Sequence, residues 1–349
     1  MTVTLTRAGS PWEVDPRDFP TKGSVEDAIR FCLNYAILAP SSHNTQPWWF
    51  RLEDDNITVG LDVSRGLAVS DPLDRQATMS SGAAALNLRV ALAHFGLAVS
   101  TQQFPDPVDP EACVRVVAHP DGDVDGELGA LFGALTARHT SHAAFEPEAI
   151  DQAVLDGLIA DASSEDARLH VFVREADRTQ IAGLVSDGDR VQMADRAFRR
   201  ELASWLRRPG SRQSDGIHGY LVGSALDEVA MTHPLVVRSF DIGDRRGARD
   251  RDLVVGSPAI LVISTSGDDR ADWLRAGQAM ERVLLRATAA GLSAGFLGAP
   301  VEVAAVRAAL SDLLGSRNVP QVVLRVGRGP RVAPQPRREL ATFLSSFGS

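Results

Sequence analysis

Residues 40–48 form the segment of this chain whose side chains are best suited to bind a small molecule. Pro40 and Pro47 interrupt any helix at its two ends. Between them lie two serines and two amide side chains: Ser41, Ser42, Asn44 and Gln46. Such a loop can present hydroxyls and amides to a flat heteroaromatic ligand with alternating donors and acceptors. The same spacing also fits an ordinary loop whose serine and asparagine satisfy nearby backbone groups.

The residue spacing does not support hydrolytic or metal chemistry. Ser42 and His43 are adjacent, but neighbouring side chains in an extended loop point apart. No Gly-x-Ser-x-Gly motif places a nucleophilic serine on a sharp turn. The histidines at 94, 119 and 170 are scattered and lack the spacing of metal ligands. We therefore expect neither a hydrolase nor a metal site.

The composition is that of a soluble globular protein with acidic charge. The chain has 349 residues, enough for one large domain or two modest ones, with 44% hydrophobic and 23% charged residues. A net charge of −9 argues against binding to nucleic acid or to an anionic membrane, because both would repel the protein. Lys22 is the only lysine, so a bound anion must be held by arginine, histidine or backbone N–H groups.

The cysteines and the N-terminus indicate a cytoplasmic protein. Cys32 and Cys113 form neither a disulfide framework nor a metal-binding pattern, and Cys32 lies in an apolar run typical of buried thiols. Residues 1–5 lack the basic and then apolar layout of a signal peptide. No apolar run approaches the ~20 residues needed to span a bilayer.

Two pairs of similar segments indicate an internal duplication. Residues 82–97 and 277–292 align at a constant offset of 195 residues, with Gly82 opposite Gly277 and Gly96 opposite Gly291. Each has apolar residues at helical spacing and ends in Gly-Leu, as a helix end before a strand does. Two alanine-rich helices can resemble each other by chance, but a second pair, 39–50 and 161–172, follows the same order.

The offset of the second pair is 122 residues, so the second half carries roughly 73 extra residues. We assign them to an insertion at about 174–258, which is polar and rich in arginine. A helical pattern over 190–206 is followed by weak periodicity. Long insertions of this kind are commonly lids or binding loops. A surface excursion without a role fits the sequence about as well.

The predicted elements give an α+β fold. Strands are expected at 169–173, 259–265 and 322–326. Helices are expected at 24–38, 79–95, 148–160, 274–290 and 301–314. Together with the repeat, they predict two fused, similar halves, 1–130 and 131–349. A helical solenoid is disfavoured because such arrays need at least three repeats.

The segment 39–48 resembles the Ala-Pro-Ser-x-x-Asn-x-Gln-Pro-Trp signature of the nitroreductase superfamily. Residues 138–142, followed by Phe145, are similar to the Arg-x-Ser-x-Arg-x-Phe motif that opens this family. The helix at 277–292, the turn at 295–298, the strand at 320–328 and the basic segment at 334–338 match later family features in the same order. The resemblance covers most of the chain and is closest to the Acg-type, two-halved FMN-binding branch.

The resemblance implies one FMN site between the two halves. Family members are homodimers in which one subunit supplies Arg-x-Ser-x-Arg, the turn and the basic segment, and the other supplies the Pro-Ser loop. In this chain the second half carries the arginine motif, the turn and the basic segment, whereas the first half carries the intact Pro-Ser loop. The reciprocal loop contains Glu165 and Asp166, whose charges would repel an anionic ligand. We therefore expect one flavin per chain in a nitroreductase-like fold that imitates the family dimer as a monomer.

The resemblance also assigns roles to individual residues. The flavin phosphate would be held by Arg138 with Arg337 or Arg338, because guanidiniums bind phosphate in a bidentate manner. The alternative for Arg337 and Arg338 is that they belong to a solvated basic tail. Thr140 keeps the hydroxyl of the family serine, and His142 replaces the second arginine, which weakens the grip on the anion unless the histidine is protonated. The expected contacts to the flavin ring and ribityl chain come from Ser41, Ser42, Asn44, Gln46 and the backbone near Leu297 and Gly298. Arg249 or Arg251 would substitute for the lysines that the family uses.

Two functions follow from an FMN site. The first is an oxidoreductase that reduces nitroaromatics, quinones or similar planar acceptors with NAD(P)H through flavin N5. The lack of a Gly-rich dinucleotide motif agrees with it, since the family binds NAD(P)H transiently in the place of the acceptor. The alternative is a non-catalytic protein that sequesters or stores FMN beneath a lid formed by residues 174–258.

Overall fold

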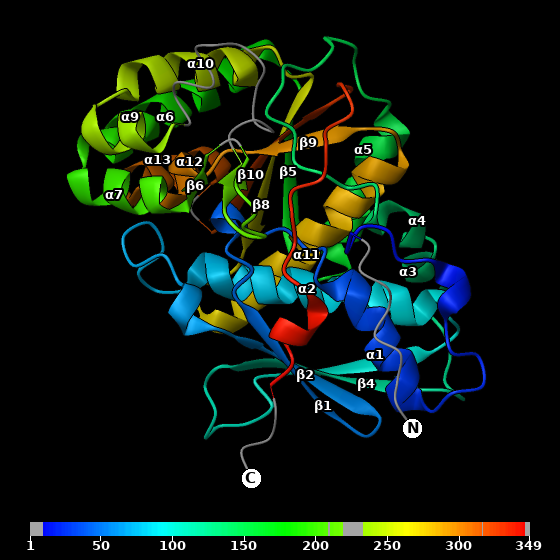
Figure 1. The fold of residues 1–349 in the computed structure, drawn as a ribbon. Helices are drawn as coiled ribbons and strands as arrows, with labels where there is room; N and C mark the ends of the chain where they lie inside the picture. The colour runs from blue at the N-terminus through cyan, green and yellow to red at the C-terminus, as the bar shows by residue number, and fades with distance from the viewer. Residues whose placement is uncertain (1–9, 209, 219–232, 316, 346–349) are drawn as a thin grey trace.

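The computed structural model describes residues 10–208, 210–218, 233–315 and 317–345. Figure 1 shows two β-sheets with a pair of long helices between them, which confirms the expected α+β fold. Within these ranges no helix is both long and apolar enough to cross a membrane. The N-terminal segment 1–5, which we judged not to be a signal peptide, lies outside the described residues.

The two sheets have the same topology. Each has four antiparallel strands. Across each sheet, the fourth strand in sequence lies between the second and the third, which gives the orders β1-β2-β4-β3 and β5-β8-β10-β9. The first sheet contains β1 (Trp48–Glu53), β2 (Asn56–Leu61), β3 (Ala98–Gln103) and β4 (Ala112–His119). The second contains β5 (Arg168–Phe172), β8 (Ala259–Thr265), β9 (Ser293–Phe296) and β10 (Val319–Gly327).

The two central helices repeat at the offset found in the sequence. Helices α2 (Arg75–His94) and α11 (Arg270–Ala289) both have 20 residues and begin 195 positions apart. They cross where Gly82 and Gly277 face the partner helix, because a Cβ at Gly82 would collide with the carbonyl oxygen of Leu274 and one at Gly277 with that of Met79. Glycine at both positions is what allows the two halves to pack so closely.

Smaller helices flank each sheet, and several bounds differ from the expected ones. The chain forms α1 (Val25–Ala36), α3 (Gly126–Gly129), α4 (Phe132–Leu135), α5 (Gln152–Ser163), α12 (Ala299–Glu302) and α13 (Ala304–Leu314). The helix expected at 148–160 starts later, at the cap provided by Asp151. The helix expected at 301–314 is two helices, because Val303 adopts an extended conformation that ends α12.

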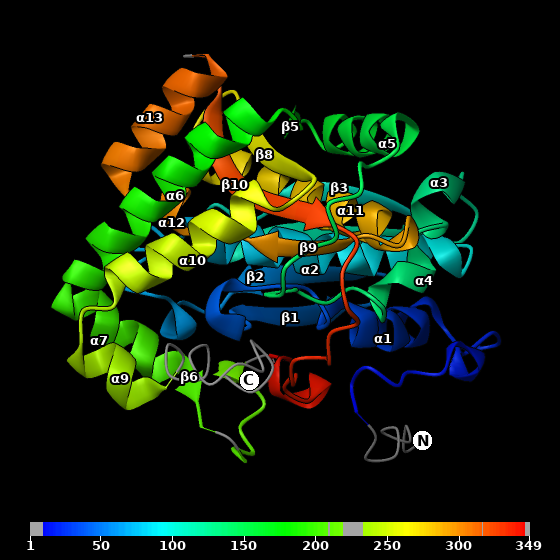
Figure 2. The same cartoon turned by 90° about the horizontal axis from the view of Figure 1, so that it is seen from above.

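The segment 174–258 is more helical than its weak periodicity suggested. It contains α6 (Glu175–Ala194), α7 (Arg196–Trp205), α9 (Pro234–Ser239) and α10 (Gly243–Val255), with short strands β6 (Leu206–Arg207) and β7 (Ile217–His218). Figure 2 shows α10 running beside α6, with all four helices gathered on one side of the molecule. Residues 219–232 of this segment are outside the described part.

The C-terminal segment returns to the first half. The Phe50 N–H donates to the carbonyl oxygen of Phe343 at 2.8 Å, and the Ser345 N–H donates to the carbonyl oxygen of Phe50 at 2.9 Å. The end of the chain therefore extends the β1 edge of the first sheet (Figure 1). In the second sheet, Thr140 bridges to Ala294 at the β9 edge, which brings the 138–142 segment to the boundary between the halves.

Candidate functional site

A cavity of about 330 Å³ lies where the two halves and the 174–258 segment meet. The loop 40–44 and the start of α2 form one wall, residues 140–142 and the 296–302 turn form another, and helices α6, α7 and α10 close it. The lining therefore collects segments that are far apart in the sequence.

The loop is held in place by Arg337. Its Nε donates to the carbonyl oxygen of Ile37 at 3.1 Å, and its Nη2 donates to those of Leu38 and Ala39 at 3.1 and 3.0 Å. These carbonyls are at the C-terminal end of α1, where a cation is favoured. Its Nη1 also donates to Asn44 Oδ1 at 2.8 Å. Arg337 thus ties the loop to the end of the helix that precedes it.

The loop carries strained backbone and unpaired polar atoms. His43 and Asn44 have φ angles of 52° and 54°, a region that side chains other than glycine rarely adopt. The Ser42 hydroxyl donates to Gln76 Oε1, which leaves Gln76 Nε2 without a partner, and His43 Nδ1 is also buried and unpaired. Each such atom costs about 1–3 kcal/mol when unsatisfied, so these atoms favour a polar ligand in the cavity.

Positive charge concentrates on the wall formed by residues 140–142. Arg325 donates to the carbonyl oxygens of Ser141 and Ala143, both at 2.8 Å, and Arg249 donates to that of His142 at 3.2 Å. Burial lowers the pKa of Arg325 to about 10, so it remains charged at neutral pH. Burial, and then the charge of Arg325, lowers the pKa of His142 to about 4, which makes its ring neutral there. This wall suits an anion.

The 174–258 segment supplies an apolar wall and a charged wall. The apolar side chains are Val185, Phe198, Leu202, Leu206 and Ile217. The charged ones form a cluster in which Arg246 Nε is 3.2 Å from Asp189 Oδ1 and 3.9 Å from Asp250 Oδ2, while Arg249 Nη1 is 2.9 Å from Asp250 Oδ1. The cavity is therefore apolar on its α7 side and ionic on its α10 side.

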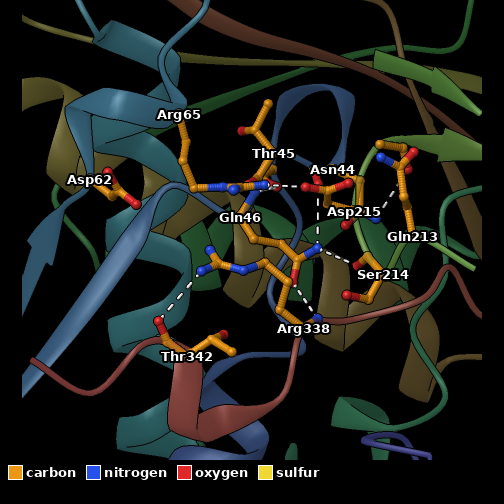
Figure 3. A network of polar contacts seen from close by, with 12 residues as sticks. Asn44, Thr45, Gln46, Asp62, Arg65, Gln213, Ser214, Asp215, Arg338 and Thr342 are labelled. Carbon is orange, nitrogen blue, oxygen red and sulfur yellow. Dashed lines mark hydrogen bonds and ion pairs between the residues drawn. The ribbon is translucent and has the colours of Figure 1, made fainter. Parts of the chain in front are cut away.

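Polar contacts tie the 174–258 segment to the first half next to the cavity. Figure 3 shows Gln46 Nε2 donating to the carbonyl oxygen of Ser214, at 2.8 Å, and Arg65 forming an ion pair with Asp215. Asn44 Nδ2 donates to the carbonyl oxygen of Gly216 at 3.1 Å. These contacts come from the same loop whose other residues line the cavity.

Eight of the residues expected at the site border this cavity: Ser41, Ser42, Asn44, Thr140, His142, Leu297, Gly298 and Arg337. The Leu297 N–H, which we expected near the ligand, donates instead to the carbonyl oxygen of Val323 at 3.0 Å. Of the two arginines expected to replace lysine, Arg249 borders the cavity, whereas Arg251 is exposed.

Three expected residues lie outside the cavity lining. Gln46 is fully buried, and its Oε1 accepts from the Arg338 N–H at 2.9 Å (Figure 3). Arg138 is 3.3 Å from the buried carboxylate of Glu281. The guanidinium of Arg338 lies over the Phe343 ring, 4.5 Å from its centre. These three side chains contact other protein groups and do not border the cavity.

The reciprocal loop contains an ion cluster instead of a cavity wall. Glu165 Oε1 is 3.0 Å from Arg282 Nη1, and its Oε2 is 2.7 Å from Arg89 Nη1. Asp161 pairs with Arg282 at 3.1 Å. Asp166 has a φ of 55°, matching Asn44 at the offset of 122 residues. The loop thus shares this one backbone feature with its counterpart, but its buried carboxylates are paired with arginines.

Several cavity residues were not anticipated, chiefly Gln76, Asp189, Arg246, Asp250 and Arg325. Asp189, Arg246 and Asp250 belong to the segment where the sequence pattern is weakest. The i,i+4 spacing of Arg246 and Asp250 was the one local signal available, and it fits any solvated helix face equally well.

Comparisons with known proteins identify the family of the chain. A family model described as "Nitroreductase family" matches residues 135–328. The chain is 30% identical over 314 residues to acg of Mycobacterium tuberculosis, whose name describes an NAD(P)H nitroreductase, covering 89% of this chain and 92% of that protein. It is 24% identical to PigM of Serratia sp., also named as an NAD(P)H nitroreductase, and the match covers 92% of this chain and 94% of that protein. A Desulfovibrio desulfuricans nitroreductase solved with FMN is 16% identical, with a TM-score of 0.37, covering 63% of this chain and 97% of that one.

Proposed function

The chain belongs to the nitroreductase family, and we propose that it is an FMN-dependent oxidoreductase that reduces planar acceptors, such as nitroaromatics and quinones, with NAD(P)H. The observation that carries the proposal is that the loop 40–44 and residues 140–142 border one cavity, although they come from different halves of the chain. These are the two segments that resemble the flavin-binding motifs of the family.

The anionic end of FMN fits the positive wall. A phosphate dianion prefers guanidinium donors and hydroxyls, and Arg249, Arg325 and Thr140 all border the cavity beside residues 141–143. We assign the phosphate to these three residues. The candidates drawn from the resemblance, Arg138 with Arg337 or Arg338, are engaged elsewhere. Arg138 pairs with Glu281, Arg337 donates to the carbonyl oxygens of residues 37–39, and Arg338 lies over the Phe343 ring.

The ring and ribityl chain fit the opposite wall. His43 Nδ1 and Gln76 Nε2 are buried polar atoms without a partner in the described structure, and both residues line the cavity beside Ser42 and Asn44. A flavin edge offers acceptors and a donor that could satisfy them. Bound FMN supplies the two-electron redox chemistry at N5, while the protein positions and shields it.

The arrangement of the halves supports one site per chain. The identical strand order of the two sheets, and the central helices of equal length 195 residues apart, support a duplicated chain that imitates a dimer. In the reciprocal position, Asp161 and Glu165 are paired with Arg282. We infer that only the site at the 40–44 loop binds flavin, so that a monomer is sufficient.

A storage function is the second candidate, favoured by the contacts that close the cavity. The segment 174–258, which we interpret as a lid, is tied to the first half through Gln46, Asn44 and Arg65. A lid that stays closed would retain flavin and exclude acceptors.

Flavin content and anaerobic reduction test both functions. The purified protein, reconstituted with FMN, is expected to bind one FMN per chain and to lose its flavin absorbance when NADH or NADPH is added without oxygen. A protein that stays colourless with excess FMN would overturn the FMN site. A yellow protein that neither nucleotide bleaches would overturn the reductase and leave storage.

A further inference from the structure

Two carboxyl groups from different helices of the lid meet in the cavity wall. Asp189 on α6 is only 2% exposed, and Asp250 lies on α10, which packs along α6. Both residues line the cavity, and Arg246 lies between them. Neither of the two motifs that bind flavin in this family includes these positions.

One carboxyl oxygen of the pair, on Asp189, lacks a hydrogen-bond donor among the described residues. Asp189 Oδ1 faces Arg246, but its Oδ2 is buried and has no hydrogen-bond partner in the described structure. Burial, helped by the neighbouring Asp250, raises the pKa of Asp189 to about 7 against the opposing charge of Arg246. Two carboxyl groups in such contact share one proton, because protonated Asp189 can donate to Asp250 and an ionised one cannot.

The other titratable groups around the cavity are poor sources of a proton. Burial lowers the pKa of His43 and of His142 to about 4, so neither ring carries an extra proton at neutral pH. Burial raises the pKa of Glu302 on α12, but the hydrogen bond that Gln192 Nε2 donates to its carboxylate at 2.5 Å favours the ionised form. Burial opposes the charge of the nearby Arg246, but the carboxylates of Asp189 and Asp250 raise its pKa, so it keeps its proton.

The reduction assigned to this site needs one proton beyond the hydride. A quinone takes two electrons and two protons to become a hydroquinone, and a nitro group takes the same to become a nitroso group and water. A hydride from the reduced nicotinamide brings two electrons and one proton and leaves the oxidised nicotinamide. The second proton must reach the acceptor oxygen from another donor.

We propose that the Asp189–Asp250 pair is the general acid that gives this second proton to the oxygen of the acceptor, and that it then regains a proton from solvent. The inference rests on the proposed reductase function and adds to it a catalytic group from the lid. It also specifies the substrate class: acceptors whose reduction requires protonation of an oxygen should depend on the pair, and acceptors that take up electrons alone should not.

The test compares two acceptors in rapid-mixing experiments with the reduced, FMN-loaded protein. A quinone needs the proton, whereas ferricyanide takes one electron and no proton. The rate with the quinone should fall as pH rises through about 7, where Asp189 loses its proton. Asp189→Asn should slow the quinone at pH 6 by about 10²-fold or more and remove this pH dependence, while the ferricyanide rate stays unchanged.

Matched controls use carboxylates on the same two helices that face solvent. Asp187 on α6 and Asp244 on α10 are exposed and pair with Arg190. Asp187→Asn and Asp244→Asn should leave both rates and the pH profile as in the unmodified protein. If Asp189→Asn slows quinone and ferricyanide equally, or leaves the quinone pH profile intact, the pair is not the acid.

A second measurement does not depend on turnover. In flavin-free protein labelled with ¹³C at the aspartate carboxyl carbons, one resonance should titrate near pH 7, vanish in Asp189→Asn and persist in Asp187→Asn. Absence of such a resonance would overturn the shared proton. A protein that binds no FMN would overturn the reductase and the acid together, whereas a bleachable protein with an unchanged Asp189→Asn profile would overturn the acid alone.

Discussion

Arg337 shows that a residue near a ligand site can act on the protein rather than on the ligand. Arg337 borders the cavity, yet the described hydrogen bonds of its guanidinium run to the end of α1, to Asn44 and to the carbonyl oxygen of Pro336. Burial lowers its pKa to about 9, so it stays charged at neutral pH. A planar fork of donors is suited to several carbonyls at once, which an ammonium group is not.

Arg337→Ala should therefore destabilise the protein by about 2–4 kcal/mol, because buried carbonyls at 37–39 lose their donors. It should also weaken FMN binding, since Asn44 loses the contact that orients it. Urea unfolding and FMN titration measure the two effects. The neighbouring Arg338→Ala removes a contact with the Phe343 ring and one long, exposed hydrogen bond to the carbonyl oxygen of Thr342 at 3.4 Å, and should cost less than about 1 kcal/mol. Equal losses in the two variants would contradict the assigned role.

The sequence could indicate residue types at the site but not all of their partners. Ser41, Ser42 and Asn44 follow from a short local pattern, and all three border the cavity. The family motif assigns Arg138 to the flavin phosphate, but nothing nearby in the sequence reveals that Arg138 instead pairs with Glu281 of α11. Long-range pairs of this kind are set by how the halves pack, which no local pattern encodes.

At the scale of elements, the contact between α2 and α11 fixes how the halves sit against each other. Gly82 and Gly277 lie where the two helices cross. The repeat offset of these helices could be predicted from sequence, because a helix leaves a long periodic signal. Their starts could not: α2 begins at Arg75 rather than 79 and α11 at Arg270 rather than 274, because polar first turns carry little periodicity.

Gly277→Ala should destabilise the protein by about 1–3 kcal/mol, because the added methyl group meets the Met79 backbone, which cannot move aside as a side chain can. Gly157→Ala in α5 is the matched change, since an added Cβ there meets no atom within 4 Å. That change should stabilise its helix by about 0.5–1 kcal/mol. Chemical unfolding of both variants tests the contact, and a neutral Gly277→Ala would show that the helices do not need this close approach.

At the scale of the whole molecule, the lid joins the two halves across the site. Its α7 helix reaches the first half through Glu201, which accepts hydrogen bonds from the Val69 N–H at 2.8 Å and the Ser70 N–H at 2.9 Å. The sequence indicated an insertion here, but not its attachment, because residues 69–70 and 201 have no pattern that links them. We infer that the strength of this attachment sets how readily FMN and acceptors exchange.

Glu201→Ala should loosen the lid without touching the cavity, because Glu201 is not among the residues that line it. Loss of these two hydrogen bonds and of a third, from the Ser70 hydroxyl at 2.6 Å, should speed the release of FMN by about 10-fold, since roughly 1.4 kcal/mol of closure is lost. Stopped-flow displacement of FMN measures this rate. Glu175→Ala, at the exposed start of α6, is the control and should release FMN as the unmodified protein does. If both variants release FMN at the unmodified rate, contacts other than that of Glu201 hold the lid, and the attachment through residues 69–70 has no part in retaining the flavin.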